Sequence, residues 1–541
     1  MPPIFFQLLT FNFFYMGSVR NIFNTIRLRK PKYNMFDLSH CNRTTFNMGH
    51  LVPTFCKEVL PGDKFTISVE NLLRFAPLIA PVMHDVHVTT HVYFVPFRLI
   101  WPEFTDWITG ESEVADPTIT INNLAVDSLG GYLELPTGDL GTDDLTVGAG
   151  PIAAYNLIYN EYYRDQNLID PLPAELSAGD NTSVFGSYAS GDTQLRAWSH
   201  DYYTSALPFA QKGDDVMLPL ADFTDVPVDL QVQPSPNAGM RVVDANLGNL
   251  NNDTIGTGGT SGLIAQTAAE LAFLDPNDNL VAKTSEMESI STSVTNVRNA
   301  FKLQMYLEKL ARGGTRYKEY LRTMFNVRSP DARLDRPEYL GSALQKMTIS
   351  EVLSTAQTLN NNNVTTNPVG QMAGHGISHG MGREIKYNSY EHGFIMGIIN
   401  VQPVTCYQQG LPKMYSRRDP LDYYLRDFAH IGEQAILNKE LYANATNAVR
   451  DQVFGYAPRY SEYKYAEDRV SGNFKTDLNF WHLGRIFASQ PTLNAEFIQC
   501  DPTDIDRIFA VTADKSNHIW GIIRNNITAV RSMARYGNPG F

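Results

Sequence analysis

Two stretches of regularly spaced apolar residues limit the possible folds of this chain most strongly. Residues 64–74 and 84–96 carry β-branched and aromatic side chains with a period of two. This spacing is typical of β-strands, because successive side chains of a strand point to opposite faces of the sheet. The turn sequence Leu60-Pro61-Gly62-Asp63 opens the first stretch. The sequence therefore predicts a β-sandwich that begins near residue 61.

The rest of the chain alternates between expected helices, loops and strands. Helices are predicted over residues 101–108, 153–164 and 297–325, the last broken at Gly313-Gly314. Loops are predicted over residues 111–150 and 171–193, and further strands over residues 393–401, 506–512 and 518–527. This order of strands, helical insertions and further strands favours a mainly β protein. We expect a single jelly roll whose connections carry the extra mass.

The length of the chain leaves two forms of domain organisation open. A chain of 541 residues can form roughly three or four domains by size alone, whereas one sandwich with long insertions needs a single core. We expect the second form, with an apolar leader over residues 1–16, a basic extended arm over residues 17–60 and a sandwich domain over residues 61–541. Its insertions include residues 111–195 and 221–290, and loops of such length usually carry a function.

Charge is distributed unevenly along the chain. The formal net charge of −13 argues against a protein that coats nucleic acid over its whole surface. Between residues 17 and 43, however, six basic residues accompany a single acid, Asp37. Residues 111–150 hold eight acids and no base, and residues 221–290 hold ten acids and two bases. The chain is therefore cationic at its ends and anionic in its middle loops.

The cationic ends are candidates for contact with nucleic acid. Flexible lysines and arginines neutralise phosphates without reading sequence, and aromatic residues of the arm can stack on unpaired bases for roughly 1–3 kcal/mol each. The alternative is a solvated tail, or a tail bound to a scaffold. The candidate DNA-binding residues are Arg20, Arg27, Arg29, Lys30, Lys32, Arg524, Arg531 and Arg535.

No pattern in the sequence indicates catalysis, a metal or a cofactor. His84, His87 and His91 cannot converge on one ion from a single strand, because His87 and His91 share a face and His84 takes the other. The glycine-rich stretch around His375 and His379 is interpreted as a flexible loop. Phosphate-binding and nucleophile-elbow motifs are missing. We therefore predict no catalytic residue, no metal ligand, no cofactor and no enzyme activity.

The first residues and the cysteines bear on processing and compartment. Residues 1–16 are apolar but lack a basic start and a small-residue cleavage site, so a signal peptide is the less favoured interpretation. Met16 is the expected natural start, which mass spectrometry of the N-terminus would test. Four scattered cysteines fit a reducing compartment such as a bacterial cytoplasm. No apolar run reaches the length of a membrane span.

A series of short sequence words, in order along the chain, resembles one viral protein family. Across residues 17–541 the chain is similar to the major capsid proteins of the Microviridae, small single-stranded-DNA phages, and within them to the gokushovirus branch. The leader before Gly17 departs from the family pattern. The words include Phe36-Asp37-Leu38-Ser39-His40, Leu60-Pro61-Gly62-Asp63, the run from Pro77 to Trp101, Gly314-Thr315-Arg316-Tyr317, Arg336-Pro337-Glu338-Tyr339-Leu340-Gly341, Phe454-Gly455-Tyr456-Ala457-Pro458 and Trp481-His482-Leu483-Gly484-Arg485.

This resemblance implies a fold, partners and a location. The fold is an eight-stranded antiparallel jelly roll with long helical and irregular insertions. Copies of the chain would assemble through pentamers into a small icosahedral shell around circular single-stranded DNA. Other implied partners are internal scaffolding proteins, small DNA-binding viral proteins and a host-cell surface receptor, with no membrane. The location implied is the virion, assembled in the cytoplasm of a bacterial host.

The resemblance also implies a role for the longest insertion. Gokushoviruses resemble one another in lacking a separate spike protein, and a capsid insertion forms a protrusion at the threefold axis instead. Residues 221–290 are the natural candidate here, because they are acidic, irregular and polar. The candidate attachment residues are Asn251, Asp253, Gly259 and Thr260.

A jelly-roll glycan-binding protein, or a glycan-active enzyme, is the alternative from another class. It would need clustered carboxylates or a set of histidine metal ligands in one sheet, and the sequence indicates neither. Uniform shells or pentamers in electron microscopy favour a capsid protein. Monomers with affinity for glycans favour the alternative.

Overall fold

The structure is a computed structural model that describes most of the chain. Side chains and backbone are described for residues 32–111, 113–141, 144–214, 216, 294–356, 369–511 and 516–536, and the backbone alone for eight short strands between residues 228 and 367. Contacts divide the chain into a larger unit, residues 1–210 with residues 311–541, and a smaller unit, residues 211–310. Each unit is described by itself.

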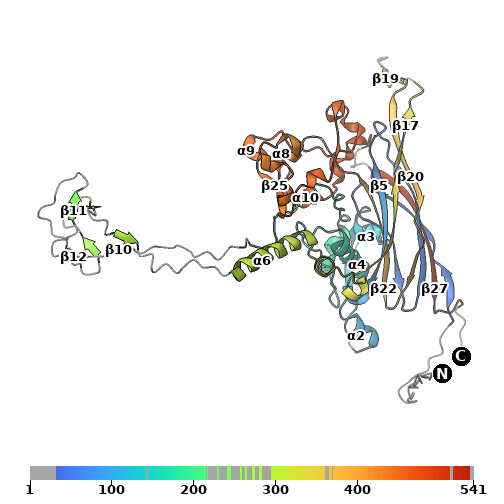
Figure 1. Ribbon diagram of the computed structural model, residues 1–541. Helices are drawn as coiled ribbons and strands as arrows, with labels where there is room; N and C mark the ends of the chain where they lie inside the picture. The colour runs from blue at the N-terminus through green and yellow to red at the C-terminus, as the bar shows by residue number, and fades with distance from the viewer. Residues whose placement is uncertain are drawn as a thin grey trace, which may run out of the picture. The chain divides into compact units, whose positions relative to one another are not determined.

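Two facing antiparallel sheets form the centre of the larger unit (Figure 1). The first sheet has seven strands: β1 (Asn34–Asp37), β2 (His40–Phe46), β4 (Lys64–Phe75), β17 (Thr348–Leu353), β20 (Met372–Met381), β21 (Ile385–Asn388) and β27 (Ile519–Arg531). The second sheet has four strands: β3 (Val52–Val59), β5 (Val86–Pro96), β16 (Glu338–Lys346) and β22 (Gly393–Pro403). The mainly β fold that the sequence predicts is confirmed.

Chain order and sheet order together give the jelly-roll arrangement. Strand β27 lies between β2 and β4 in the seven-stranded sheet, and β22 lies between β3 and β5 in the four-stranded sheet. The chain therefore crosses from sheet to sheet as it passes through β2, β3, β4 and β5, as it does in jelly rolls. The expected count of eight strands is not reproduced, because β1, β17 and β21 add to the first sheet.

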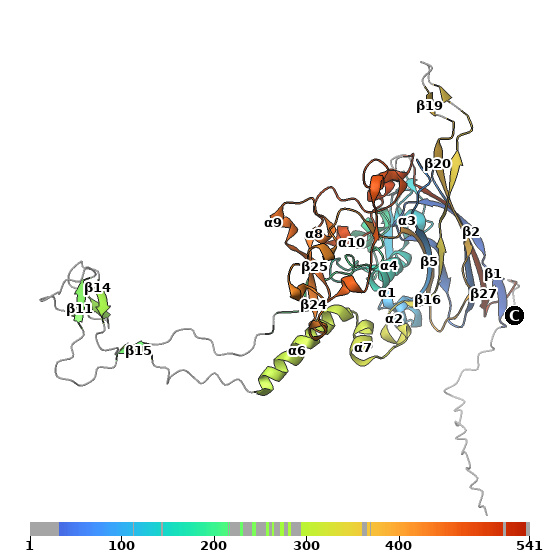
Figure 2. The same ribbon diagram turned by 45° about the horizontal axis from the view of Figure 1, so that its top comes forward.

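The two central strands of the four-stranded sheet, β5 and β22, are buried on both faces. One face packs against the seven-stranded sheet in a core that contains Val88 and Phe94 of β5. The other face packs, through Tyr93 and Met396, against helices α1 (Phe97–Ile100), α2 (Phe104–Thr109), α3 (Leu129–Tyr132), α4 (Gly150–Ile158) and α5 (Thr182–Ser190). Figure 2 shows α3 and α4 beside β5, on the side away from β27. Burial on both faces explains the nearly continuous apolar run in β22 and the apolar second half of β5.

The basic extended arm that the sequence predicts over residues 17–60 is wrong for residues 34–59. Strands β1 and β2 pair with β27, and β3 pairs with β22, so residues 34–59 belong to the two sheets. The sequence did not reveal these pairings, because all of the partners lie more than 300 residues further along the chain. In the described part of the chain, only residues 32 and 33 precede the first strand.

The helices of the insertions are partly as predicted. The predicted helix over residues 153–164 is α4 followed by a π-helical turn, Tyr159–Tyr163. The helical stretch near residue 300 consists of α6 (Val294–Gly313) and α7 (Tyr317–Phe325), and the break falls at Gly314, whose φ of +88° favours glycine. None of the helices in the described part of the chain is both long and apolar enough to cross a membrane.

Four predicted elements are wrong. The expected loops contain α3, α5 and the short strands β6 (Thr118–Ile121), β7 (Asn123–Leu124), β8 (Gly138–Asp139) and β9 (Leu145–Gly148). The strand predicted over residues 506–512 begins with a 3₁₀ turn, Asp506–Ile508. The glycine-rich stretch with His375 and His379 is strand β20 and not a loop. Its glycines allow close packing, because a Cβ on Gly374 would lie 2.4 Å from the carbonyl oxygen of Ala80.

A third core supports a small lobe at the edge of the larger unit. It is built from Tyr203, Tyr407, Ile436, Phe454 and Phe497 with their neighbours. The lobe contains β24 (Glu433–Leu437), β25 (Val453–Pro458), α8 (Asn438–Leu441), α9 (Asn447–Arg450) and α10 (Ala495–Ile498).

The smaller unit contains three nested antiparallel pairs of short strands. The outermost pair is β10 (Val228–Leu230) with β15 (Leu280–Ala282). The next is β11 (Arg241–Asp244) with β14 (Leu271–Leu274), and the innermost is β12 (Gly256–Gly258) with β13 (Gly262–Ile264). Each pair therefore joins an earlier strand of the predicted insertion over residues 221–290 to a strand that follows it.

The histidines near β5 are held by ordinary structural contacts. His84 lies before the strand, and its Nε2 donates a hydrogen bond of 2.7 Å to the carbonyl oxygen of Val404. Within β5, His87 and His91 share one face, as predicted. Nδ1 of His91 lies 2.7 Å from the hydroxyl oxygen of Tyr163, which also accepts a hydrogen bond from Tyr93.

Acid should weaken the fold through His91. Burial, assisted by the nearby guanidinium of Arg196, lowers the pKa of His91 to about 4 from 6.5. The unfolded chain protonates His91 near pH 6.5, whereas the folded chain protonates it only near pH 4. The folded state therefore has its full stability above pH 6.5 and loses stability as the pH falls toward 4. We predict that the free energy of unfolding decreases over this range by up to about 3 kcal/mol on account of His91.

Urea unfolding of His91→Gln at a series of pH values checks this prediction. The variant should lose less stability between pH 6.5 and 4 than the wild type does. His87→Gln, on the same face of the same strand, is the control and should keep the wild-type acid sensitivity. Identical pH profiles for His91→Gln and the wild type would contradict the assignment.

Candidate nucleic-acid interface

The structure divides the predicted DNA-binding residues into three groups. Arg20, Arg27, Arg29 and Lys30 lie outside the described residues. Lys32 and Arg535 are exposed, just before β1 and just after β27, and Arg524 and Arg531 lie on β27 itself. The predicted attachment residues Asn251, Asp253, Gly259 and Thr260 also lie outside the described residues.

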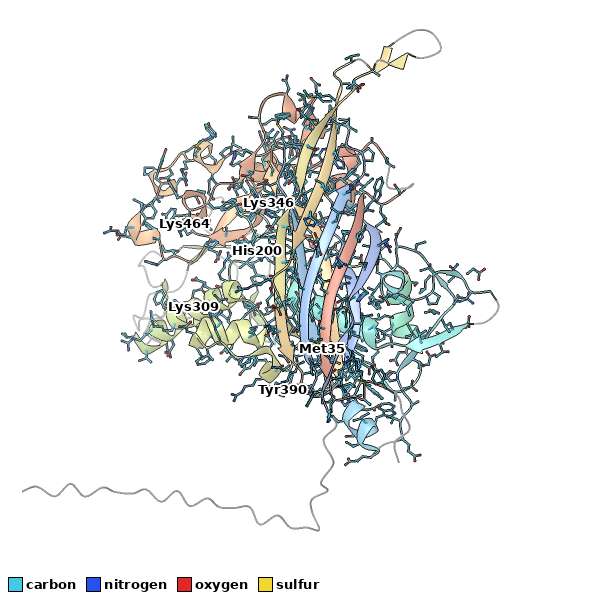
Figure 3. The ribbon with its side chains drawn as sticks, turned by 90° about the vertical axis from the view of Figure 1, so that its right-hand side faces the viewer. Met35, His200, Lys309, Lys346, Tyr390 and Lys464 are labelled. Carbon is cyan, nitrogen blue, oxygen red and sulfur yellow. The ribbon has the colours of Figure 1, made fainter. Side chains whose placement is uncertain are left out.

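The outward side of the seven-stranded sheet is open to solvent over its central strands. Exposed and buried residues alternate along β27, so that Trp520 and Arg524 are exposed while Ile519 and Ile523 face the core. Figure 3 looks onto this sheet, with Met35 labelled near its lower end, and no described helix crosses in front of the central strands. We call this surface the open face.

Strand register brings three arginines together on the open face. The outward residues of β2, β27 and β4 stand in three rows, Thr45–Trp520–Arg74, Arg43–Ile522–Leu72 and Cys41–Arg524–Glu70. Side chains in adjacent rows of a sheet lie within reach of one another. Arg43, Arg74 and Arg524 therefore surround an apolar centre made by Trp520, Ile522 and Leu72.

A shallow groove accompanies this cluster. It measures about 520 Å³ and is lined by Arg43, Arg74, Trp520 and their strand neighbours. The indole of Trp520 is 42% exposed, and its Nε1 donates a 3.0 Å hydrogen bond to the carbonyl oxygen of Asn517. The ring is therefore fixed in position while much of its surface remains available to a ligand.

The open face is cationic although the chain is acidic. No ion pair joins Arg43, Arg74 or Arg524 to another residue of the described chain. Glu70, the cross-strand neighbour of Arg524, has a carboxylate oxygen 3.4 Å from Nε2 of His379. Guanidinium groups stay charged at any physiological pH and suit phosphate oxygens geometrically. The arrangement can hold a polyanion against an exposed aromatic ring.

Sequence reasoning found only part of this site. It singled out Arg524, but it counted Arg43 with the arm and missed Arg74 and Trp520. The period of two in residues 64–74 and 518–527 was enough to place Arg74 and Trp520 on the outward side of their strands. The adjacency of β2, β27 and β4 was the missing information.

Arg531 has a different place from Arg524, although both lie on β27. Its Nε lies 2.9 Å from Oδ2 of Asp63, which is 2% exposed, and its Nη2 donates a 2.6 Å hydrogen bond to the carbonyl oxygen of Glu58. Asp63 in turn belongs to the turn between β3 and β4. Arg531 therefore forms an ion pair within the protein, and this ion pair holds the end of β27 against the turn.

The two arginines of β27 should respond differently to substitution. Arg531→Gln leaves the buried carboxylate of Asp63 without its cation and should lower the free energy of unfolding by about 3 kcal/mol. Arg524→Gln removes an exposed side chain without an ion-pair partner and should change it by less than about 0.5 kcal/mol. Urea unfolding of both variants tests this, and equal losses would contradict the assignment of Arg531.

Comparison with known proteins gives consistent matches over nearly the whole chain. A family model described as capsid protein (F protein) matches residues 25–541. The chain is 32% identical to capsid protein VP1 of Bdellovibrio phage phiMH2K, over 93% of this chain and 94% of that protein. It is also 32% identical to capsid protein VP1 of Chlamydia phage 1, over 96% of this chain and 98% of that protein. Capsid protein VP1 of Spiroplasma virus 4 is 27% identical, over 95% and 98%.

Proposed function

The chain belongs to the phage capsid protein (F protein) family, and from this premise we propose that it encloses a single-stranded DNA genome, with its open face turned toward the DNA. As a capsid protein it is a structural component of the virion and not an enzyme. Membership of the family also agrees with the resemblance to Microviridae capsid proteins and disfavours the glycan-binding alternative.

The cationic open face is the observation that carries this proposal. A chain with a net charge of −13 repels DNA in general, so contact is restricted to surfaces where the local charge is positive. Arg43, Arg74 and Arg524 supply such a surface without acid partners among the described residues. Their contribution is independent of base sequence, as a shell protein requires, because the arginines would neutralise phosphates.

An unpaired strand is favoured over a duplex by the ring at the centre of the cluster. Trp520 can stack on an unpaired base, and stacking contributes about 1–3 kcal/mol per base. Bases inside a duplex are already stacked on one another and cannot use this ring. Lys32 and Arg535 add positive charge at the far end of the same sheet, because β1 pairs with residues 528–531 of β27, and Lys32 precedes β1 while Arg535 follows β27.

We further propose that residues 221–290 attach the particle to its host. The segment belongs to the smaller unit, and its six described strands pair only with one another. A segment of this kind can change without disturbing the core. Its ten acids also keep it away from DNA. Assembly through pentamers, internal scaffolding partners and a host-cell receptor remain part of this proposal.

Neutralising the three arginines should weaken DNA binding without harming the fold. The variant Arg43→Gln/Arg74→Gln/Arg524→Gln should bind oligo(dT) more weakly in fluorescence anisotropy. Its salt dependence, log Kd against log salt, should flatten by about 2, because each lost phosphate contact removes about 0.7. Particles made from the variant should contain less DNA.

The control variant carries the same change of charge elsewhere. Arg322, Arg328 and Arg333 are exposed arginines of α7 and the segment that follows it. Their triple change to glutamine should leave the affinity and the salt slope at wild-type values. Equal effects of the two triple variants would mean that only net charge matters, and would remove the open face from the proposal.

Replacing Trp520 should affect the choice between unpaired and paired DNA. We predict that Trp520→Leu lowers the affinity for oligo(dT) by about tenfold or more, with little change in the salt slope or in the affinity for a duplex. Trp107→Leu is the control, since Trp107 is 38% exposed on α2, away from the open face. Unchanged oligo(dT) affinity for Trp520→Leu would exclude stacking on this ring.

Deleting the insertion should separate assembly from attachment. Because Leu230 pairs with Leu280, residues 231–279 can be replaced by a short glycine-containing turn that joins the two strands. Particles with this deletion should form and contain DNA but no longer adsorb to host cells. Normal adsorption of the deleted particles would assign attachment to another part of the capsid.

A further inference from the structure

A second exposed surface lies on the small lobe of the larger unit. We call it the tyrosine surface, and its large side chains have exposed fractions between 46% for Tyr465 and 65% for Tyr415. Monomeric proteins rarely expose so many large apolar side chains in one area, and such patches usually mark contacts with partners. The surface consists of Met414, Tyr415, Tyr423, Tyr424, Tyr463 and Tyr465.

Three rings of the tyrosine surface, those of Tyr423, Tyr424 and Tyr463, are held in place before any partner binds. The guanidinium carbon of Arg417 lies 4.3 Å from the ring centre of Tyr463 and 5.8 Å from that of Tyr423. Tyr424 packs edge to face on Tyr460, with ring centres 5.0 Å apart. Because these side chains are already ordered, binding to them costs little conformational entropy.

A groove of about 600 Å³ runs beside these rings, and its charges are balanced. Three cations line it, and each has a carboxylate partner that also lines it. The pairs are Lys413 with Glu440 at 3.4 Å, Arg417 with Glu462 at 3.0 Å and Arg469 with Glu467 at 3.0 Å. The tyrosine surface therefore differs from the open face, whose arginines are unpaired within the described chain.

These features indicate a protein partner. Tyrosine and arginine are the side chains most enriched at the energetic centres of protein interfaces, where charges are paired or excluded. DNA is disfavoured as the partner, because the groove offers no uncompensated positive charge. A shell built from many copies of one chain requires contacts between copies, and an exposed, ordered and neutral aromatic surface meets that requirement.

We propose that the tyrosine surface is a contact between this chain and a second copy of it. The inference rests on the proposed shell function, which supplies the second copy as the partner. The surface would bury its rings and the adjoining groove against the neighbouring subunit. The partner would therefore cover side chains that are exposed in the single chain.

Removing the rings should impair assembly and leave DNA binding intact. The test variant is Tyr423→Ser/Tyr424→Ser/Tyr463→Ser, examined by analytical ultracentrifugation of the full chain. The protein concentration needed for half-assembly should rise by about tenfold or more. The control changes three exposed tyrosines elsewhere, Tyr33, Tyr317 and Tyr390, to serine and should assemble as the wild type does. Normal assembly of the test variant would overturn the proposal.

Two further measurements exclude a trivial loss of folding. The thermal unfolding midpoint of each variant should stay close to that of the wild type. Met414→Lys, at a side chain that is 58% exposed, adds a charge to the surface without removing a ring and should impair assembly as well. If Met414→Lys assembles normally, the contact does not include this surface and the proposal fails.

A photo-crosslinking amino acid in place of Tyr415 identifies the partner directly. Irradiation of assembled particles should give a product with twice the mass of the chain. A crosslink only to DNA or to another protein would overturn the proposal. DNA binding by the open face and the subunit contact at the tyrosine surface can be tested independently. The tyrosine variants should still bind oligo(dT), and the variant without Arg43, Arg74 and Arg524 should still form the Tyr415 crosslink.

Discussion

Burial of the central strands β5 and β22 on both faces is the constraint on which the rest of the structure depends. Strands β5 and β22 contribute side chains to the sandwich core on one side and to the helical layer on the other. The helices of residues 97–190 therefore gather against this sheet and leave the central strands of the opposite sheet uncovered. The open face exists because helices α1 to α5 pack on the other side of the sandwich.

The two exposed surfaces of the subunit differ in whether their cationic side chains are paired with carboxylates. On the open face the arginines have no acid partners within the described chain, so their field extends into solvent. On the tyrosine surface each groove cation has a carboxylate about 3 Å away, which cancels the field and leaves aromatic area as the main source of binding energy. One chain can thus present a surface for a polyanion and a different surface for protein.

The sequence predicted the fold class better than the site, for a physical reason. Patterns of apolar residues report the local environment of a strand, and they located β4, β5, β22 and most of β27 correctly. Pairing depends on residues that are hundreds of positions apart, so the sequence could not reveal that residues 34–59 belong to the sheets. Arg531 illustrates the same limit, because only the fold shows that its charge is opposed by Asp63. The sequence also did not reveal why β20 is rich in glycine. Its glycines allow close packing and do not form a flexible loop.

The position of β27 has a consequence for the order in which the molecule can form. This strand is made after more than 500 other residues, yet it lies between β2 and β4, which are made among the first 75. Neither of those strands can complete its hydrogen bonds along β27 until residue 531 has left the ribosome. Their edges stay unsatisfied throughout synthesis, a state that is prone to misassembly. The same delay keeps the arginines of β2, β4 and β27 apart, so a growing chain does not carry a finished site for nucleic acid.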